Sequence, residues 1–218
     1  MTLKEKIIGI FSPAARKRHS LVGSKRLWKM KRDFQIKFLK EVGLRPAHRL
    51  MDIGCGTLRG GIPFIDYLQE GNYCGLEARE KVLEEAKLEL REAGFENKKP
   101  ALVHSPKLAE LNLGKTFDFI WAFSVLIHMN DQILDECMQL VEKHLASDGS
   151  FYANVNFGDR HEGSWQGFPV VFRDLKFYEQ AAARHRMKVV DIGTLASLGH
   201  VSGVDLQDKG RMLKFTKV

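Results

Sequence analysis

The stretch LMDIGCGTLRGG, residues 50–61, decides the fold of this chain. An apolar run that ends at Asp52 predicts a short buried strand, and the glycines after it predict a tight turn that leads into a helix. Gly54 and Gly56 have the spacing of a nucleotide-binding turn, but Arg59 stands where a dinucleotide fingerprint has its third glycine. The stretch therefore predicts a cofactor-binding turn and leaves the class of cofactor open.

Short apolar runs alternate with amphipathic segments on both sides of this stretch. Strands alternating with helices of this length indicate βαβ units and a mostly parallel, doubly wound sheet. No helix is expected between the last two strands, so we predict that they form an antiparallel pair at one edge. The strands are expected at residues 49–53, 72–77, 101–105, 117–129 (running into a loop), 150–157, 187–195 and 211–218, and the helices at 27–43, 60–71, 79–95, 130–149 and 173–185.

The charge of the chain is concentrated at its N-terminus. The net charge is +7, but residues 1–32 hold ten lysines and arginines and one acid, so the remaining chain is slightly acidic. A nucleic-acid-binding domain would carry basic residues on its folded body, so this distribution disfavours one. Residues 1–26 are predicted to be a basic, helical N-terminal extension. An apolar cluster at residues 7–11 precedes basic residues 16–19, so the extension either docks on the domain or contacts an anionic membrane surface.

The chain has the composition of a globular protein with no membrane-spanning segment. Hydrophobic residues make up 44% and charged residues 28%, and no apolar run reaches the ~18 residues that a transmembrane helix needs. The three cysteines, Cys55, Cys74 and Cys137, form no CxxC pair, which argues against a metal site. Together with the lack of a secretory leader pattern, this indicates a cytoplasmic protein, with Cys74 and Cys137 in the core.

Two classes of cofactor fit the first turn. A dinucleotide would use Gly54, Gly56 and the acid at the end of the second strand, Glu77, but Arg59 breaks its fingerprint. S-adenosylmethionine has no phosphate and carries positive charge on its methionine part, so Asp52 just before the turn would suit it as an anchor. The residues favour the second class.

The motifs LMDIGCG, YCGLE, FSVLIHM and RMLKF together resemble those of class I S-adenosylmethionine-dependent methyltransferases. The resemblance covers residues 27–218 and is similar in its details to small bacterial enzymes associated with glycans, natural products and other small molecules. It implies a Rossmann-like, seven-stranded sheet whose last strand runs antiparallel. It also implies S-adenosyl-L-methionine as cofactor and S-adenosyl-L-homocysteine as product.

The resemblance carries specific residues to the cofactor site. Glu77 would accept hydrogen bonds from both ribose hydroxyls, because a carboxylate has two acceptor oxygens. The sequence departs from the family at Leu58, which replaces the third glycine of the loop, and after the third strand, where His104 and Ser105 replace the usual acid. The cofactor-lining residues that the resemblance implies are Asp52, Gly54, Cys55, Gly56, Glu77, Ala78, Ser105, Phe123 and Ser124.

Three residues are candidates for the general base that methylation of a hydroxyl needs. His128 follows the fourth strand, and its alternative role is to pack on the cofactor or to cap a backbone carbonyl. Asp159 and His161 belong to the polar, aromatic loop of residues 156–174, in which Trp165 could form a stacking wall for a sugar or aromatic ring. No metal site is expected, and four other histidines, His19, His48, His144 and His185, are expected at the surface.

The sequence thus predicts a methyltransferase that acts on a small molecule or glycan, with oxygen as the expected acceptor atom. Three alternatives remain open. A nicotinamide-dependent oxidoreductase would share the turn. A nucleic-acid methyltransferase would explain the basic N-terminal extension, although the (N/D)PP(Y/F) motif of amino-methylating enzymes is missing. A non-catalytic scaffold that keeps the cofactor fold is the third.

Overall fold

The computed structural model describes residues 18–158 and 163–218 of the chain. The chain divides into two compact units. Unit 1 is built from residues 1–48 and 54–106, and unit 2 from residues 49–53 and 107–218. The glycine turn therefore belongs to unit 1, and the strand before it belongs to unit 2.

Seven strands are ordered β3-β2-β1-β4-β5-β9-β8 in one sheet. The pairs β1–β4, β2–β3 and β4–β5 are parallel, whereas β9 is antiparallel to both β5 and β8. This order confirms the predicted seven-stranded sheet with an antiparallel last strand, and it places β9 inside the sheet with β8 at its edge. The strands are β1 (Leu50–Ile53), β2 (Tyr73–Glu77), β3 (Ala101–His104), β4 (Phe117–Ala122), β5 (Leu145–Val155), β8 (Met187–Thr194) and β9 (Arg211–Lys217).

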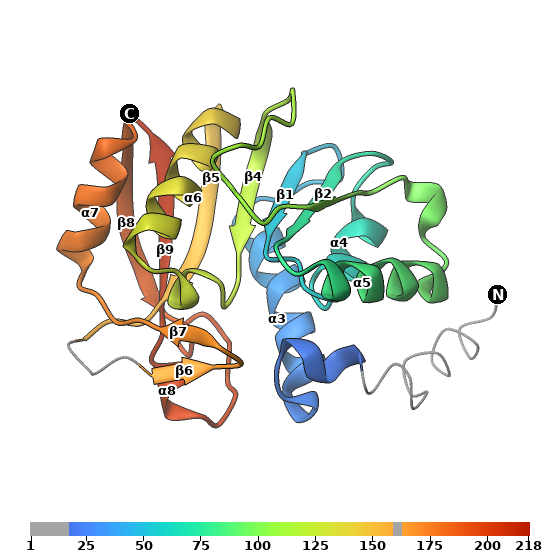
Figure 1. Cartoon of the computed structure of the whole chain (residues 1–218), viewed down its shortest axis with the longest axis horizontal. Helices are drawn as coiled ribbons and strands as arrows, with labels where there is room; N and C mark the ends of the chain where they lie inside the picture. The colour runs from blue at the N-terminus through green and yellow to red at the C-terminus, as the bar shows by residue number, and fades with distance from the viewer. Residues whose placement is uncertain (1–17, 159–162) are drawn as a thin grey trace. The chain divides into compact units, whose positions relative to one another are not determined.

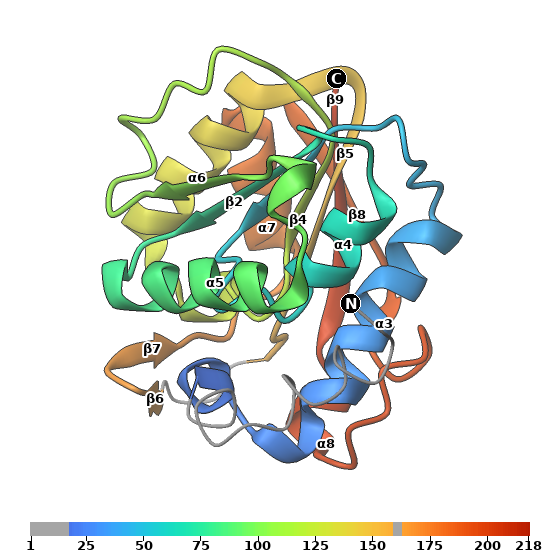
Figure 2. The ribbon, with the colours of Figure 1, turned by 90° about the vertical axis from the view of Figure 1, so that its right-hand side faces the viewer.

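Among the described residues, unit 1 joins β2 and β3 to the helices α3, α4 and α5 (Figure 2). The helices are α3 (Trp28–Glu41), α4 (Gly61–Tyr67) and α5 (Glu80–Ala93), with short 3-10 helices η1 (Ser20–Val22), η2 (Lys25–Leu27) and η3 (Glu96–Lys98). Helix α5 buries one apolar stripe against β2 and β3, as its 3.6-residue periodicity predicts. It ends at Gly94 in the left-handed conformation, which is the usual C-terminal stop of a helix.

Unit 2 contains β1, the C-terminal half of the sheet and two long helices. Helices α6 (Asp131–His144) and α7 (Leu175–Arg184) lie side by side (Figure 1). Their starts are capped by Asn130 and Asp174, whose side chains accept hydrogen bonds from backbone N–H groups. A 3-10 turn η4 (Leu126–His128), a hairpin of β6 (Gly163–Trp165) and β7 (Phe168–Val170), and the short α8 (Asp205–Asp208) complete the unit.

Several expectations from the sequence were wrong in detail. The helix predicted to end at Gly149 ends at His144, because Leu145 already pairs with Phe117 and starts β5. The helix predicted for residues 60–71 ends at Tyr67, and the hairpin β6–β7 was not predicted at all. His19 and His144 are buried, not at the surface. His144 Nδ1 lies 2.8 Å from the carbonyl oxygen of Lys115, which explains why a histidine is tolerated there.

Gly75 in β2 is expected to be intolerant of a side chain. A Cβ atom at this position would lie 2.9 Å from Cys55 Sγ and 3.1 Å from Tyr73 Cε1, both of them buried. We expect Gly75→Ala to lower the free energy of unfolding by about 1–3 kcal/mol through overpacking, measured by urea denaturation. Gly163→Ala is the control, because nothing lies within 4 Å of its Cβ position. Equal stability of the two variants would contradict the tight packing at β2.

Candidate functional site

The glycine turn and the end of β2 form one hydrogen-bonded group in unit 1. Gly54 and Gly56 both have positive φ angles, +69° and +58°, which explains why glycine stands at these positions. The N–H of Cys55 donates to the carbonyl oxygen of Leu76 at 2.9 Å, and the N–H of Gly56 donates to Glu77 Oε2 at 3.1 Å. The turn therefore holds the carboxylate of Glu77 in a fixed orientation.

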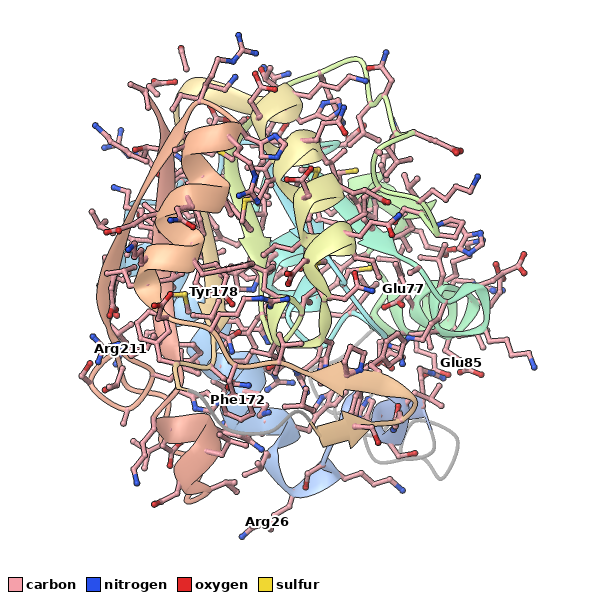
Figure 3. The ribbon with its side chains drawn as sticks, turned by 60° about the vertical axis from the view of Figure 1, so that its left-hand side comes forward. Arg26, Glu77, Glu85, Phe172, Tyr178 and Arg211 are labelled. Atoms are coloured by element: carbon pink, nitrogen blue, oxygen red, sulfur yellow. The ribbon has the colours of Figure 1, made fainter. Side chains whose placement is uncertain are left out.

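Glu77 is buried with both carboxylate oxygens engaged (labelled in Figure 3). Its side chain is 6% exposed. Oε1 accepts hydrogen bonds from the backbone N–H and the Nε–H of Arg79, each at 3.0 Å. A buried carboxylate needs such donors to offset its desolvation. Arg79 was not identified from the sequence, since only its position two residues after the predicted ribose carboxylate could have suggested it.

Leu58 stands at the position of the turn where the family has its third glycine. Its φ angle is +62°, in the left-handed region that a glycine would adopt easily and a leucine rarely does. Its side chain is fully buried, and its Cδ2 atom lies 2.5 Å from the position that a Cβ on Gly61 would take. Burial of the side chain offsets the backbone strain. Leu58 thus adopts a left-handed conformation at the position where the family has a glycine.

The side chain of Arg59 contacts the segment that precedes α3 and the first residue of that helix. Its Nη1 donates to the carbonyl oxygen of Val22 at 3.0 Å, and its guanidinium lies over the ring of Trp28, 5.8 Å from the centroid. The residue that breaks the dinucleotide fingerprint therefore binds the segment before α3.

The remaining predicted residues of unit 1 lie at the ends of β2 and β3. Ser105 is buried, and its N–H donates to the carbonyl oxygen of Glu77 at 2.9 Å. Ala78 is exposed, and its carbonyl oxygen lies 3.0 Å from His104 Nε2. Ser105 and Ala78 thus lie next to Glu77, and their contact with a cofactor stays a prediction.

In unit 2, Asp52 is the third residue of β1, and Phe123 and Ser124 follow the end of β4. Asp52 is buried and lies opposite Trp121 in the β1–β4 register. Phe123 stacks on Trp121, with the ring centroids 5.6 Å apart. Ser124 has a φ angle of +59°, and its N–H donates to Asn154 Oδ1 at 2.6 Å. Asn154 was missed from the sequence, although an asparagine inside the apolar run of β5 was a visible signal.

His128, in η4, is fixed by the β6–β7 hairpin. Its Nδ1 lies 2.8 Å from the carbonyl oxygen of Pro169. Since a carbonyl oxygen can only accept, Nδ1 carries the proton of the neutral ring and Nε2 carries the lone pair. The ring stacks on Trp165 at 5.3 Å and lies tilted against Phe168 at 6.3 Å. The contact with the carbonyl oxygen of Pro169 matches the capping role considered for His128, and the role as general base stays a prediction.

Two candidate bases are not placed by the structure. Asp159 and His161 lie outside the described residues. Within residues 18–158 and 163–218, no cluster of three or more histidine, cysteine, aspartate or glutamate side chains could hold a metal ion. His128 is therefore the predicted base whose surroundings can be described.

Comparisons with known proteins agree with the fold. Residues 51–151 match the family model described as a methyltransferase domain. The chain is similar to the solved CcbJ methyltransferase from Streptomyces caelestis, with 13% identity, a TM-score of 0.67, and coverage of 86% of this chain and 90% of that chain. It is also similar to magnesium protoporphyrin IX methyltransferase (ChlM) from Synechocystis PCC 6803, solved with S-adenosylmethionine, with 16% identity, a TM-score of 0.67, and coverage of 100% and 99%.

A third similar structure is the glycopeptide N-methyltransferase MtfA in complex with S-adenosylhomocysteine. The identity is 15%, the TM-score is 0.65, and 95% of this chain and 98% of that chain are covered. No curated protein matches the chain by sequence. At these identities the structural neighbours establish the fold, and the acceptor has to be inferred from the residues of this chain.

Proposed function

We propose that this protein is an S-adenosylmethionine-dependent methyltransferase that transfers a methyl group to an oxygen atom of a small molecule or glycan; the match of residues 51–151 to a methyltransferase domain and the order of the seven strands support this proposal. The observation that carries the cofactor assignment is the buried carboxylate of Glu77, held by the amide of Gly56 in the glycine turn. A carboxylate fixed at the end of β2 suits the vicinal hydroxyls of a ribose.

The residues of each unit fit this cofactor in chemical type. S-adenosylmethionine supplies an electrophilic methyl group on a sulfonium centre. Glu77 would bind the ribose, and the buried carboxylate of Asp52 would anchor the positively charged methionine part. The other proposed cofactor residues are Gly54, Cys55, Gly56, Ala78 and Ser105 in unit 1, and Phe123 and Ser124 in unit 2. An oxidoreductase gains no support, because the family model that matches residues 51–151 describes a methyltransferase domain.

The proposal that oxygen is the acceptor atom rests on the contacts of His128. An alcohol becomes a competent nucleophile when a base removes its proton as the new bond to carbon forms. Nε2 of His128 would take that proton, while Nδ1 keeps its hydrogen bond to Pro169. The stacked ring of Trp165 would favour the resulting imidazolium through a cation–π contact. Asp159 and His161 remain proposed alternatives for the same task.

The acceptor is proposed to be a small molecule or a glycan. The neighbours' own names refer to a glycopeptide and to magnesium protoporphyrin IX, both of which are compatible with a small-molecule or glycan class. Trp165 in the hairpin could provide a stacking wall for a sugar or aromatic ring. A nucleic-acid acceptor is not supported, because Arg18, one of the basic residues that suggested it, is buried among glutamates.

A peripheral membrane contact through residues 1–26 remains a proposal, and so does a cytoplasmic location. Among the described residues of this segment, Lys25 and Arg26 are exposed, and Figure 3 shows Arg26 pointing away from the ribbon. These two side chains could contact anionic lipid. No helix within the described part of the chain is long and apolar enough to cross a membrane.

The proposal is tested by cofactor binding followed by product analysis. Isothermal titration calorimetry should show binding of S-adenosylhomocysteine and no binding of NAD. Turnover with deuteromethyl S-adenosylmethionine and matched pairs of hydroxyl and amine acceptors should label the hydroxyl member, measured by mass spectrometry. Binding of NAD instead would reject the cofactor, and labelling of amines alone would reject the acceptor atom.

A further inference from the structure

Residues Arg18–Val22, which we call the strap, pack directly on the glycine turn of unit 1. Val22 Cγ1 lies 2.7 Å from the position that a Cβ atom on Gly56 would occupy. At that distance any side chain at Gly56 would collide with the strap. The strap therefore rests on the turn that is proposed to receive the cofactor.

Two arginines of the candidate site bind the strap's backbone. Arg79 Nη1 donates to the carbonyl oxygen of Leu21 at 3.2 Å, and Arg59 Nη1 donates to the carbonyl oxygen of Val22 at 3.0 Å. Arg79 is the same residue whose Nε donates to Glu77 Oε1. One guanidinium thus connects the strap to the carboxylate proposed to bind ribose.

The N-terminal end of the strap is anchored on α5 by Arg18. Its guanidinium contacts Glu85 at 3.1 Å, Glu89 at 2.5 Å and Glu92 at 2.8 Å, and its side chain is 2% exposed. The spacing of the three glutamates places them on one face of the helix. The hydrogen bond from Arg18 lowers the pKa of Glu92 and raises that of Arg18. The strap is therefore held by a multidentate ion cluster at one end.

The next residue of the strap adds an aromatic contact. His19 stacks on Trp28 with ring centroids 3.5 Å apart, and its Nε2 lies 3.2 Å from Glu89 Oε1. This stack connects the strap to the first residue of α3. Movement of the strap away from unit 1 would have to separate the two rings.

The contacts of Glu77 conflict with a bound ribose. Oε1 already accepts two hydrogen bonds from Arg79, and Oε2 accepts one from the N–H of Gly56 and a longer one, at 3.5 Å, from Arg79 Nη2. A carboxylate oxygen has about two acceptor positions, so a diol that binds both oxygens must displace the Arg79 side chain from Oε1. When that guanidinium leaves Glu77, its hydrogen bond to Leu21 is lost as well.

We propose that the strap and the cofactor's ribose exclude one another, and that Arg79 is the positioning residue that couples them. The inference rests on the proposed function of Glu77. Docking of the strap lowers the fraction of molecules that can bind cofactor, and so it raises the apparent Kd by the inverse of that fraction. Docking of the strap therefore lowers the rate of cofactor association, whereas the rate at which bound cofactor dissociates does not depend on the strap.

The test loosens the strap at Arg18, far in sequence from the cofactor residues. For Arg18→Gln we expect about tenfold faster association of S-adenosylhomocysteine in stopped-flow measurements, an unchanged dissociation rate, and a Kd lower by the same factor. In the absence of cofactor, hydrogen exchange of the peptide covering residues 18–27 should become faster. Arg26→Gln is the control, because it removes the same charge from an exposed position. Glu92→Gln is the second variant if Arg18→Gln does not fold.

The possible results separate the strap from the proposed function. A faster dissociation with a higher Kd would overturn the inference, because the strap would then close over bound cofactor. Unchanged rates despite faster hydrogen exchange would also overturn it. If neither wild type nor variant binds S-adenosylhomocysteine, the proposed function fails. Slow hydrogen exchange in the wild type and fast hydrogen exchange in Arg18→Gln would then still show that Arg18 holds the strap in place. The proposed coupling of the strap to the cofactor would be rejected together with the proposed function.

Discussion

Replacement of Glu77 by glutamine is expected to weaken binding of S-adenosylhomocysteine by about 100-fold or more. Hydrogen bonds to a charged group contribute about 1.5–3 kcal/mol each, and two ribose hydroxyls would lose a charged acceptor. Since about 1.4 kcal/mol corresponds to a tenfold change in Kd, the loss spans two or more orders of magnitude. The glutamine amide would also face the N–H of Gly56 or of Arg79, which are donors themselves. Titration calorimetry measures the effect.

The matched control for this change is Glu80→Gln. Glu80 is exposed in the first turn of α5, only three residues away, so the substitution removes the same charge from the same region. Circular dichroism and urea denaturation of both variants establish that the fold is kept. In Glu77→Gln, a weaker contact with Arg79 would also release the strap, which would raise the affinity for cofactor. We expect this gain in affinity to be smaller than the loss of the ribose contacts. An affinity of Glu77→Gln within threefold of the wild type would remove Glu77 from the ribose role.

The sequence predicted the parts of the molecule that local patterns determine. Gly54 and Gly56 stand where positive φ angles are needed, and Glu77 stands at the end of a short apolar run. The topology of the sheet could be predicted because a chain of alternating strands and helices can adopt only a few topologies. The left-handed conformation of Leu58 was not predicted, since it depends on burial of that side chain and not on local preference.

The strap could not have been predicted in the same way. Its anchor joins Arg18 to residues of α5 that are 67 to 74 positions away in the sequence. Read locally, Arg18 belongs to a basic run that suits a solvated or lipid-facing segment, and the glutamates belong to an exposed helix face. Only the tertiary fold shows that these opposite charges neutralise each other. Asn154 in β5 was likewise not predicted, because its partner Ser124 follows β4 and is 30 residues away in the sequence.

Replacement of His128 by asparagine is expected to lower kcat by about 10²- to 10⁴-fold while leaving the Kd of S-adenosylhomocysteine within threefold of the wild type. An asparagine amide can still donate to the carbonyl oxygen of Pro169, as Nδ1 does now, but it has no basic nitrogen in place of Nε2. The wild-type rate should rise with pH, because only the neutral imidazole can take the proton of the acceptor hydroxyl. The variant should lose this rise, measured from initial rates with a hydroxyl acceptor.

The control is His185→Asn. His185 belongs to the same unit, follows the last residue of α7, and is paired with Asp135 of α6. The kcat and pH profile of this variant should match the wild type. The pH profile distinguishes the two roles of His128. If the histidine only packs on the hairpin, its replacement would change the rate but would leave the pH dependence of the rate unchanged. If His128→Asn retains the wild-type pH dependence, the ionising base is a different residue, and Asp159 and His161 become the candidates to replace next. If the dependence is lost together with kcat while cofactor affinity is kept, proton removal from a hydroxyl is the step that His128 serves.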